Sequence, residues 1–390
     1  MSKNKILIVS DYLFDELFGG CARVSTMLSK SLSFKYEVKL FLRGIKNSPK
    51  REFINNVEIF RHYGNVFLAI KNLKIIFEKK DIRVVNYHDP LNSFFVFLFL
   101  KLNRIKVPQI YTFHSPWSEE YKIRAKKKGY SRIRISICSY LRKLAERMAL
   151  SSCDKIITES DYMNEILFKI HAIKSEAIYL GVDTVKFSPC SLEEKLRLRK
   201  EYKLPLDKKI FFTLRNLEPR MGLENLINSV KILKNLGHKN LFFIIGGGGS
   251  MELELKKLAL EMELSNKVLF TGKIPDEEIV SYYRLSDAFI LPTKELEGFG
   301  LVSAEAMSSG IPVLATPVSA NIKVIGDLDK SLLFKGIDSA DIAKGIIAFL
   351  NRKDLEQLGE KARKYVESNF SQSKYIEKLE NIFYEMSYMR

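Results

Sequence analysis

Two carboxylates, two glycines and the predicted start of a helix occur together near residue 300. The stretch opens with Glu297-Gly298-Phe299-Gly300-Leu301 and reaches Glu305 about one turn into the helix. Glycine lets the backbone come close to a ligand, and the first N–H groups of a helix have no partner within it. Such a loop suits a phosphate group or a sugar hydroxyl.

Each glutamate of this stretch has two interpretations. Glu297, in the loop, could accept hydrogen bonds from a sugar, and Glu305 could hold a ribose diol. Alternatively, Glu297 is a solvated loop charge and Glu305 a residue that interacts with the helix dipole. Taken singly, either residue favours the second interpretation, so the surrounding pattern has to decide.

The elements that position these residues follow a repeated strand, loop and helix pattern in both halves of the chain. Short apolar runs alternate with amphipathic stretches, which is typical of a doubly wound parallel α/β sheet. The predicted strands are 5–10, 36–42, 57–63, 83–87, 109–113 and 155–158 in the first half, and 210–214, 241–245, 268–270 and 288–291 in the second.

The stretch as a whole resembles the Glu, seven residues, Glu motif of retaining nucleotide-sugar glycosyltransferases of family four, the glycosyl transferases group one. The resemblance rests on Gly-Phe-Gly-Leu-Val at 298–302, Glu-Ala-Met at 305–307 and Gly-Ile-Pro-Val at 310–313. It extends along most of the chain. It implies the α/β GT-B fold, in which two Rossmann-like doubly wound domains face each other across a cleft.

This resemblance divides the chain into two domains and a final helix. Residues 1–187 would form the N-terminal acceptor-binding domain, and residues 188–371 the C-terminal nucleotide-sugar-binding domain. The segment 181–189 resembles the family's entry to the interdomain linker. Residues 372–390 are expected to form a C-terminal helix that packs back on the N-terminal domain.

Ligands of doubly wound sheets bind beyond the carboxyl ends of the strands, which selects residues in the first half. Gly19 and Gly20 could give N–H groups to a diphosphate, or simply form a helix-entry turn. His114 matches the strand-end histidine that lines the family's sugar pocket, although a histidine after a strand is more often structural. Asp89, next to His88, is a weaker candidate for contact with the acceptor.

The chain departs from the family where an arginine and a lysine usually grip the donor diphosphate. Aligned on Gly222, Asn216 stands at the arginine position and Met221 at the lysine position. Arg215 and Arg220 are each one residue away. Their guanidinium groups could still bind a diphosphate bidentately if the loop turns them inward.

Two further loops of the second half could border the phosphates. Gly246 begins a run of four glycines that resembles the family's nucleotide-side glycine loop, although a strand-to-helix turn alone could require it. Lys323 stands where the family favours a glutamate. It would either add positive charge near the phosphates or point to solvent.

Positive charge is concentrated in the first half. Residues 1–185 contain 32 Lys and Arg against 18 Asp and Glu, whereas the remainder has 31 against 28. An anionic membrane surface, a phosphorylated lipid or glycan acceptor, or a nucleic acid would each suit this charge. Because no zinc-finger, RRM or KH pattern accompanies it, we expect no nucleic-acid partner. The alternative is a solvated basic face.

The sequence predicts a cytoplasmic protein, peripheral on the inner face of the membrane. Residues 5–10 suit a first buried strand better than the apolar region of a secretory signal. The longest apolar block, 94–100, is well below the ~18 residues needed to span a bilayer. The four cysteines fit no zinc spacing or disulfide framework, which favours reduced thiols.

The resemblance implies retaining transfer of a hexose from a nucleoside-diphosphate sugar to a glycan or lipid-linked acceptor, in cell-envelope polysaccharide or glycolipid synthesis. Arg215 or Arg220 would stabilise the leaving diphosphate in place of a metal, so no metal or other cofactor is expected. Glu297 and the 298–301 backbone would orient the sugar. The alternative is a catalytically silent GT-B-fold binding or scaffold protein.

Overall fold

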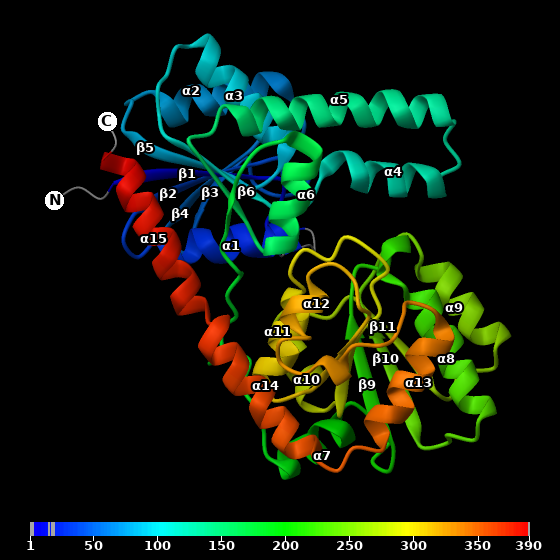
Figure 1. Ribbon diagram of the computed structural model, residues 1–390. Helices are drawn as coiled ribbons and strands as arrows, with labels where there is room; N and C mark the ends of the chain where they lie inside the picture. Colours follow the sequence, from blue (N-terminus) through cyan, green and yellow to red (C-terminus); the bar gives the residue numbers. More distant parts are fainter. Residues whose placement is uncertain (1–3, 15, 17–19, 389–390) are drawn as a thin grey trace. The chain divides into compact units, whose positions relative to one another are not determined.

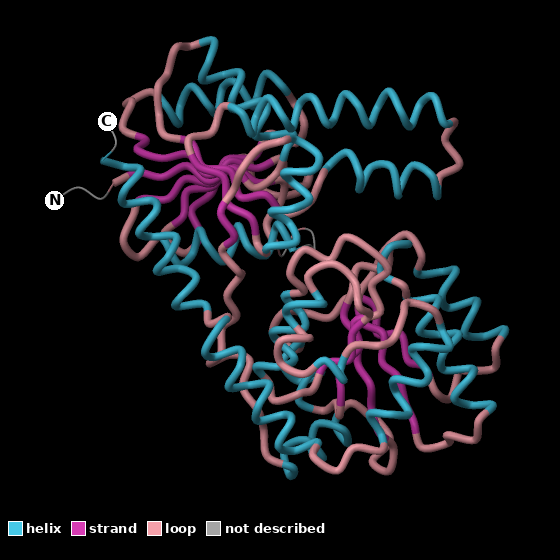
Figure 2. The backbone as a smooth tube through the Cα atoms, viewed as in Figure 1, coloured by secondary structure: helices cyan, strands magenta, loops and turns pink. Residues whose placement is uncertain are grey.

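The structure is a computed structural model that describes residues 4–14, 16 and 20–388. The chain divides into two compact units: unit 1 comprises Met1–Tyr179 with Lys374–Arg390, and unit 2 comprises Leu180–Ser373. Each unit has a central sheet with helices against it, as Figures 1 and 2 show. The predicted fold of two doubly wound α/β domains is confirmed.

The segment that follows Tyr179 is fixed within unit 2 by side-chain contacts. The ring of Phe187 lies edge-on to that of Tyr283, with centroids 5.8 Å apart. Ser308 Oγ donates to Phe187 O over 2.6 Å, and Arg284 Nε donates to Ser188 O over 2.9 Å. Residues 187 and 188 therefore belong with unit 2, and the unit boundary lies after Tyr179 instead of after residue 187.

The sheet of unit 1 has the strand order β3-β4-β2-β1-β5-β6-β7-β8 over the described residues. Its strands are β1 (Lys5–Ser10), β2 (Glu37–Leu42), β3 (Arg51–Ile54), β4 (Val57–Arg61), β5 (Ile82–Tyr87), β6 (Gln109–Phe113), β7 (Lys155–Thr158) and β8 (Glu176–Ala177). Only β3 pairs antiparallel, to β4, in this part of the chain. The hairpin turns at Asn55 and Asn56, both with positive φ, a conformation that asparagine tolerates. Sequence periodicity did not predict β3 or β8.

Helices cover both faces of this sheet. They are α1 (Gly20–Leu32), α2 (Val66–Phe77), α3 (Pro90–Leu102), α4 (Trp117–Lys127), α5 (Arg132–Ser151), α6 (Asp161–His171) and α15 (Gln372–Tyr388). α1 lies on one face, and α2 and α3 lie on the other (Figure 1). α15 contributes Leu379 and Phe383 to the buried residues of unit 1. No helix among the described residues has both the length and the apolar character needed to cross a membrane.

The sheet of unit 2 is parallel throughout its described strands, in the order β11-β10-β9-β12-β13. Its strands are β9 (Lys209–Leu214), β10 (Leu241–Gly246), β11 (Val268–Gly272), β12 (Ala288–Leu291) and β13 (Val313–Ala315). Its helices are α7 (Leu192–Glu201), α8 (Leu223–Asn235), α9 (Glu252–Glu261), α10 (Ile279–Arg284), α11 (Leu301–Ser308), α12 (Asn321–Val324), α13 (Ser339–Leu350) and α14 (Leu355–Asn369). Because β9 and β12 are neighbours, the residues after them meet at one edge.

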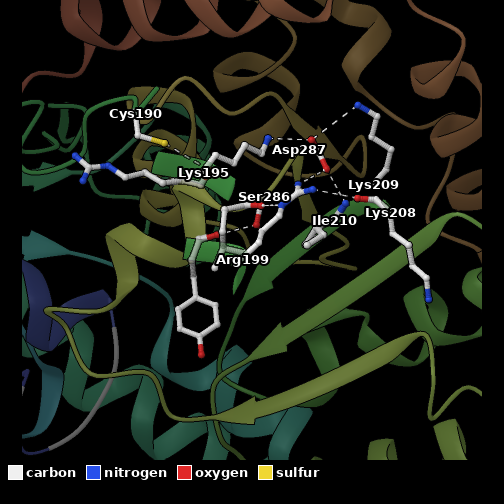
Figure 3. A network of polar contacts seen from close by, with 11 residues as sticks. Cys190, Lys195, Arg199, Lys208, Lys209, Ile210, Ser286 and Asp287 are labelled. Atoms are coloured by element: carbon white, nitrogen blue, oxygen red, sulfur yellow. Dashed lines mark hydrogen bonds and ion pairs between the residues drawn. The ribbon is translucent and has the colours of Figure 1, made fainter. Parts of the chain in front are cut away.

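A partly buried aspartate joins the amino ends of these two strands (Figure 3). Asp287, directly before β12, accepts a hydrogen bond from Ile210 N of β9 over 2.7 Å. It also pairs with Arg199 over 2.7 Å and with Lys195 over 2.9 Å, both from α7. Burial alone would raise the pKa of Asp287, but the two cations outweigh burial and lower it. The network therefore fixes β9 against β12, and with them the residues at their opposite ends.

Candidate active site

Arg215 and Glu297 meet at the carboxyl ends of β9 and β12. Arg215 Nη2 donates to Glu297 Oε2 over 2.6 Å and to Thr293 Oγ1 over 3.1 Å. Thr293 Oγ1 in turn donates to Glu297 Oε2 over 2.8 Å. The structure thus brings together two residues predicted for the site and adds Thr293, which the sequence did not single out.

This cluster is buried, and its positive charges favour the ionised form of Glu297. The exposed fraction of Arg215 is 9% and that of Glu297 is 7%. Burial would raise the pKa of Glu297, but the charges of Arg215 and Arg220, with hydrogen bonds from Thr293 and Arg215, outweigh burial and lower it. Glu297 is therefore held as a carboxylate. Arg215 Nε is buried and has no hydrogen-bond acceptor among the described residues.

The structure gives a physical reason for the unusual methionine in this loop. Met221, at the end of a short 3₁₀ turn (Pro219–Met221), is buried, and its Sδ lies 2.8 Å from Arg215 Nη2. A lysine side chain there would place a second cation against the Arg215 guanidinium. Arg220 is oriented differently, because its Nη1 donates to Leu296 O over 2.8 Å.

The glycine loop after β10 supports the backbone that carries Arg215. Gly246 O accepts from Arg215 N, and Gly248 O accepts from Leu217 N, each over 3.0 Å. Gly247 has a φ of 114°, and a Cβ there would lie 1.8 Å from Arg215 O. Close backbone approach thus requires this glycine, whether or not a nucleotide also binds the loop.

The start of α11 borders the same cluster. Gly300, with a φ of 81°, precedes the first turn, and its carbonyl accepts from Ser303 N over 2.8 Å. Ser303 Oγ in that turn is buried and has no partner in the described part of the chain. Phe299 is buried edge-on against Phe370, with ring centroids 5.2 Å apart, so its side chain is packed in the core.

Glu305 lies inside α11 and is almost completely buried, with an exposed fraction of 1%. Its Oε2 accepts a hydrogen bond from Tyr283 OH of α10 over 2.9 Å. A ribose contact would have to share or replace this bond. Lys323, for which the sequence left two alternatives, is exposed on α12.

In unit 1, polar side chains at the ends of β5, β6 and β7 form a continuous chain of hydrogen bonds. His114, after β6, contacts Glu159 Oε2 through Nδ1 over 3.1 Å and His88 Nδ1 through Nε2 over 3.0 Å. His88 Nε2 contacts Asn86 Oδ1 over 2.6 Å. Both ring nitrogens of His114 therefore have partners in the protein.

The two histidines differ in charge. Burial, together with the neighbouring His114, lowers the pKa of His88 well below its ordinary value. Burial also disfavours the charged form of His114, but Cys21 and Glu159 outweigh burial and raise its pKa. A charged His114 donates to both Glu159 and His88, and a neutral His88 donates to Asn86 Oδ1. With these protonation states, each hydrogen bond among these four side chains has one donor and one acceptor.

Asp89 follows β5 and caps α3, since its Oδ1 accepts from Asn92 N over 2.9 Å. Its Oδ2 is buried and has no hydrogen-bond partner among the residues described. Burial, with the nearby Asp11 carboxyl, raises the pKa of Asp89 to about 7. Gly20 is exposed at the start of α1, and Gly19 lies outside the described residues.

We expect Asp89→Asn to flatten the pH dependence of stability. The raised pKa means that the native state binds an extra proton between pH 3.8 and about 7, so wild-type stability falls as pH rises through this window. Asparagine keeps the acceptor for Asn92 N and cannot ionise. At pH 8 the variant should gain stability, by ~4 kcal/mol at most.

Urea unfolding between pH 4 and 8 measures this effect, with Asp154→Asn as the matched control. Asp154 is exposed and also accepts a backbone hydrogen bond, from Gln109 N over 2.8 Å. Equal pH slopes for wild type and Asp89→Asn would contradict the prediction.

Three polar partners were missed by the sequence analysis. Glu159 directly follows a predicted strand, so the rule that selected His114 could also have found it. Thr293 lies two residues after β12 and carried the same signal. Tyr283 had no local signal, because it is on α10 and reaches Glu305 only through the packing of α10 and α11.

Comparison with known proteins identifies the family of the chain. Residues 194–365 match the family model of Glycosyl transferases group 1, and residues 18–186 match that of Glycosyltransferase Family 4. The chain belongs to the group 1 glycosyltransferases. Both halves of the chain thus match a glycosyltransferase family, as the resemblance predicted.

Several known proteins match nearly the whole chain. The glycosyltransferase is 25% identical to "Uncharacterized glycosyltransferase MJ1069" of Methanocaldococcus jannaschii, over 98% of this chain and 99% of that protein. Sucrose-phosphate synthase from Thermosynechococcus elongatus superposes with a TM-score of 0.82 at 18% identity, over 98% and 99% of the two chains. Anabaena HepE in complex with UDP-glucose gives a TM-score of 0.77 at 16% identity, also over 98% and 99%. These structures show the GT-B fold.

Proposed function

We propose that the glycosyltransferase moves a hexose from a nucleoside-diphosphate sugar to a glycan or lipid-linked acceptor with retention of configuration. The observation that carries the donor site is the buried Arg215–Glu297 pair beside the start of α11. The unpartnered Arg215 Nε and Ser303 Oγ are donors that an anionic oxygen would satisfy. The UDP-glucose bound by HepE supports a nucleotide-sugar donor.

In this proposal, each group has a distinct task. Arg215 and the first N–H groups of α11 stabilise the diphosphate as it leaves. Glu297 holds Arg215 in place and orients the sugar together with the 298–301 backbone, while Glu305 receives the ribose. Arg220 adds positive charge, which also lowers the pKa of Glu297.

Protein cations supply the positive charge at the diphosphate in this proposal, so transfer needs no metal or other cofactor. The sequence contains an Asp-x-Asp pair, Asp327 and Asp329, of the kind that binds metals in other enzymes. Asp329 Oδ1 accepts from Ser331 N over 2.9 Å, and Arg352 Nη2 lies 3.1 Å from Asp329 Oδ2. Asp329 therefore serves as a turn cap.

The acceptor is assigned to unit 1. His114 and Asp89 lie at adjacent strand ends, and the unpartnered Asp89 Oδ2 is an acceptor for a sugar hydroxyl. The net positive charge of residues 1–185 favours an anionic acceptor or an anionic membrane surface. Cell-envelope polysaccharide or glycolipid synthesis at the cytoplasmic face of the membrane fits these features.

A thermal-shift screen of UDP, GDP, ADP, CDP and their sugars tests the donor site. A ligand at a hundred times its dissociation constant adds ~2.7 kcal/mol of stability. If one nucleotide raises the unfolding temperature more than the others, the sugars linked to that nucleotide are the donors to test. The anomeric configuration of the transfer product then tests retention. No shift with any nucleotide would instead favour the silent binding protein.

A further inference from the structure

α4 and α5 form a helical hairpin that extends beyond the sheet of unit 1 (Figure 1). The hairpin is anchored at its base by Glu146, whose Oε1 accepts from Trp117 N over 3.2 Å and whose Oε2 contacts His171 Nε2 over 3.0 Å. Ala149 and Leu150, at the end of α5, belong to the core cluster of unit 1. The hairpin is therefore a fixed part of the unit and not a loose arm.

The outer face of α5 carries a stripe of exposed apolar side chains. Their exposed fractions range from 39% to 75%, and they recur at helical spacing. At about 3.6 residues per turn, all of them fall within an arc of about 100°. The α5 stripe consists of Ile133, Ile137, Tyr140, Leu141, Leu144 and Met148. Such an arc would normally face a core, and here it faces away from the buried side of α5.

Basic side chains flank the α5 stripe near both of its ends. Arg134 lies next to one edge of the arc and Arg147 next to the other. Between residues 117 and 151 there are ten Lys and Arg but only three Asp and Glu. Of these acidic residues, Glu146 is buried, and Glu119 and Glu120 are paired with Lys122 and Arg124.

This combination selects a lipid surface over a second copy of the chain. A symmetric dimer would bring the same stripe and the same flanking cations of both copies together. The hairpin has no unpaired acidic side chain among its described residues that could neutralise them. An anionic bilayer instead accepts the apolar side chains at the headgroup boundary and the cations beside the lipid phosphates.

We propose that the α5 stripe and its flanking cations dock the glycosyltransferase on an anionic lipid bilayer. α5 would lie along the surface with Leu141 and Leu144 at the centre of the contact. This inference does not depend on the donor site of unit 2, because the hairpin lies wholly within unit 1.

Flotation of the full-length protein with vesicles tests the proposal. Binding is expected to vesicles of phosphatidylcholine with phosphatidylglycerol, and much less to phosphatidylcholine alone. The triple variant Ile137→Ser, Leu141→Ser, Leu144→Ser should bind at least about tenfold more weakly. Arg134→Gln and Arg147→Gln should each lower binding about fivefold at low salt.

Serine substitutions of exposed leucines on a helix of unit 2 provide a matched control. Leu253 and Leu260 on α9 are exposed by 83% and 67%, so Leu253→Ser, Leu260→Ser should float like wild type. Unchanged circular dichroism and nucleotide thermal shifts in the triple variant would show that neither folding nor the donor site was lost.

Three results would overturn the proposal. The first is wild-type protein that fails to float with anionic vesicles at low salt, and the second is a triple variant that floats as well as the α9 control. The third is a concentration-dependent dimer in sedimentation velocity that the triple variant abolishes, which would assign the stripe to a second copy.

Discussion

Glu297→Gln is expected to lower kcat by about 10²–10³-fold while leaving the protein folded. The glutamine oxygen can still accept hydrogen bonds from Arg215 and Thr293, so the geometry of the cluster persists. The negative charge that balances Arg215 is lost. Fixed charges aimed at a reacting centre contribute rate differences of this size. Transfer to a competent acceptor, measured alongside thermal unfolding, separates the two effects.

Glu297→Ala is a poorer test, because it should also unfold more easily. Removing one partner of a buried ion pair leaves the other charge uncompensated, at a cost of ~3–5 kcal/mol. The lowered pKa of Glu297 also makes stability depend on pH. The ionised Glu297 contributes fully to the free energy of unfolding above its ordinary pKa of 4.5, and this contribution is lost as pH falls through the lowered pKa. Glu297→Ala should not show this loss of stability in acid.

The nearby Glu295 provides a matched control for the glutamine variant. It is exposed in the same loop, so Glu295→Gln should keep both activity and stability. Full turnover by folded Glu297→Gln protein would remove Glu297 from the proposed mechanism.

Gly247→Ala is expected to have the second large effect, on stability and on nucleotide binding together. The new Cβ would lie 1.8 Å from Arg215 O, and the φ of 114° is one that side chains rarely adopt. Because the colliding atom belongs to the backbone, the 215–217 segment would have to move. Arg215 would then lose its position against Glu297. Denaturant unfolding and nucleotide thermal shifts measure the two consequences.

Gly237→Ala separates backbone strain from this collision. Gly237 also has a positive φ, 85°, but a Cβ there meets nothing within 4 Å. This control should lose only the ~1–2 kcal/mol that a left-handed conformation costs and should keep nucleotide binding. A similar, small loss in both variants would show that the glycine loop does not hold Arg215.

The sequence by itself determined the fold and predicted where the site would lie. Strands with buried apolar runs, alternating with amphipathic helices, indicated two doubly wound units, and both are present. The strand-end rule selected His114 and Asp89, because the ends of parallel strands lie at one edge of a sheet. Glu297 was selected by the glycine-rich motif that contains it, and Arg215 by the loop aligned on Gly222. These signals are local, which is why a linear pattern contains them.

Only the tertiary structure decided which of these groups are partners. Arg215 pairs with Glu297 because β9 and β12 are neighbours although more than seventy residues separate them in the chain. Glu305 is bound to Tyr283, and Gly247 supports Arg215, through packing that no local pattern encodes. Strand order and helix packing set these distances, and the sequence specifies them only through the complete set of contacts in the folded unit.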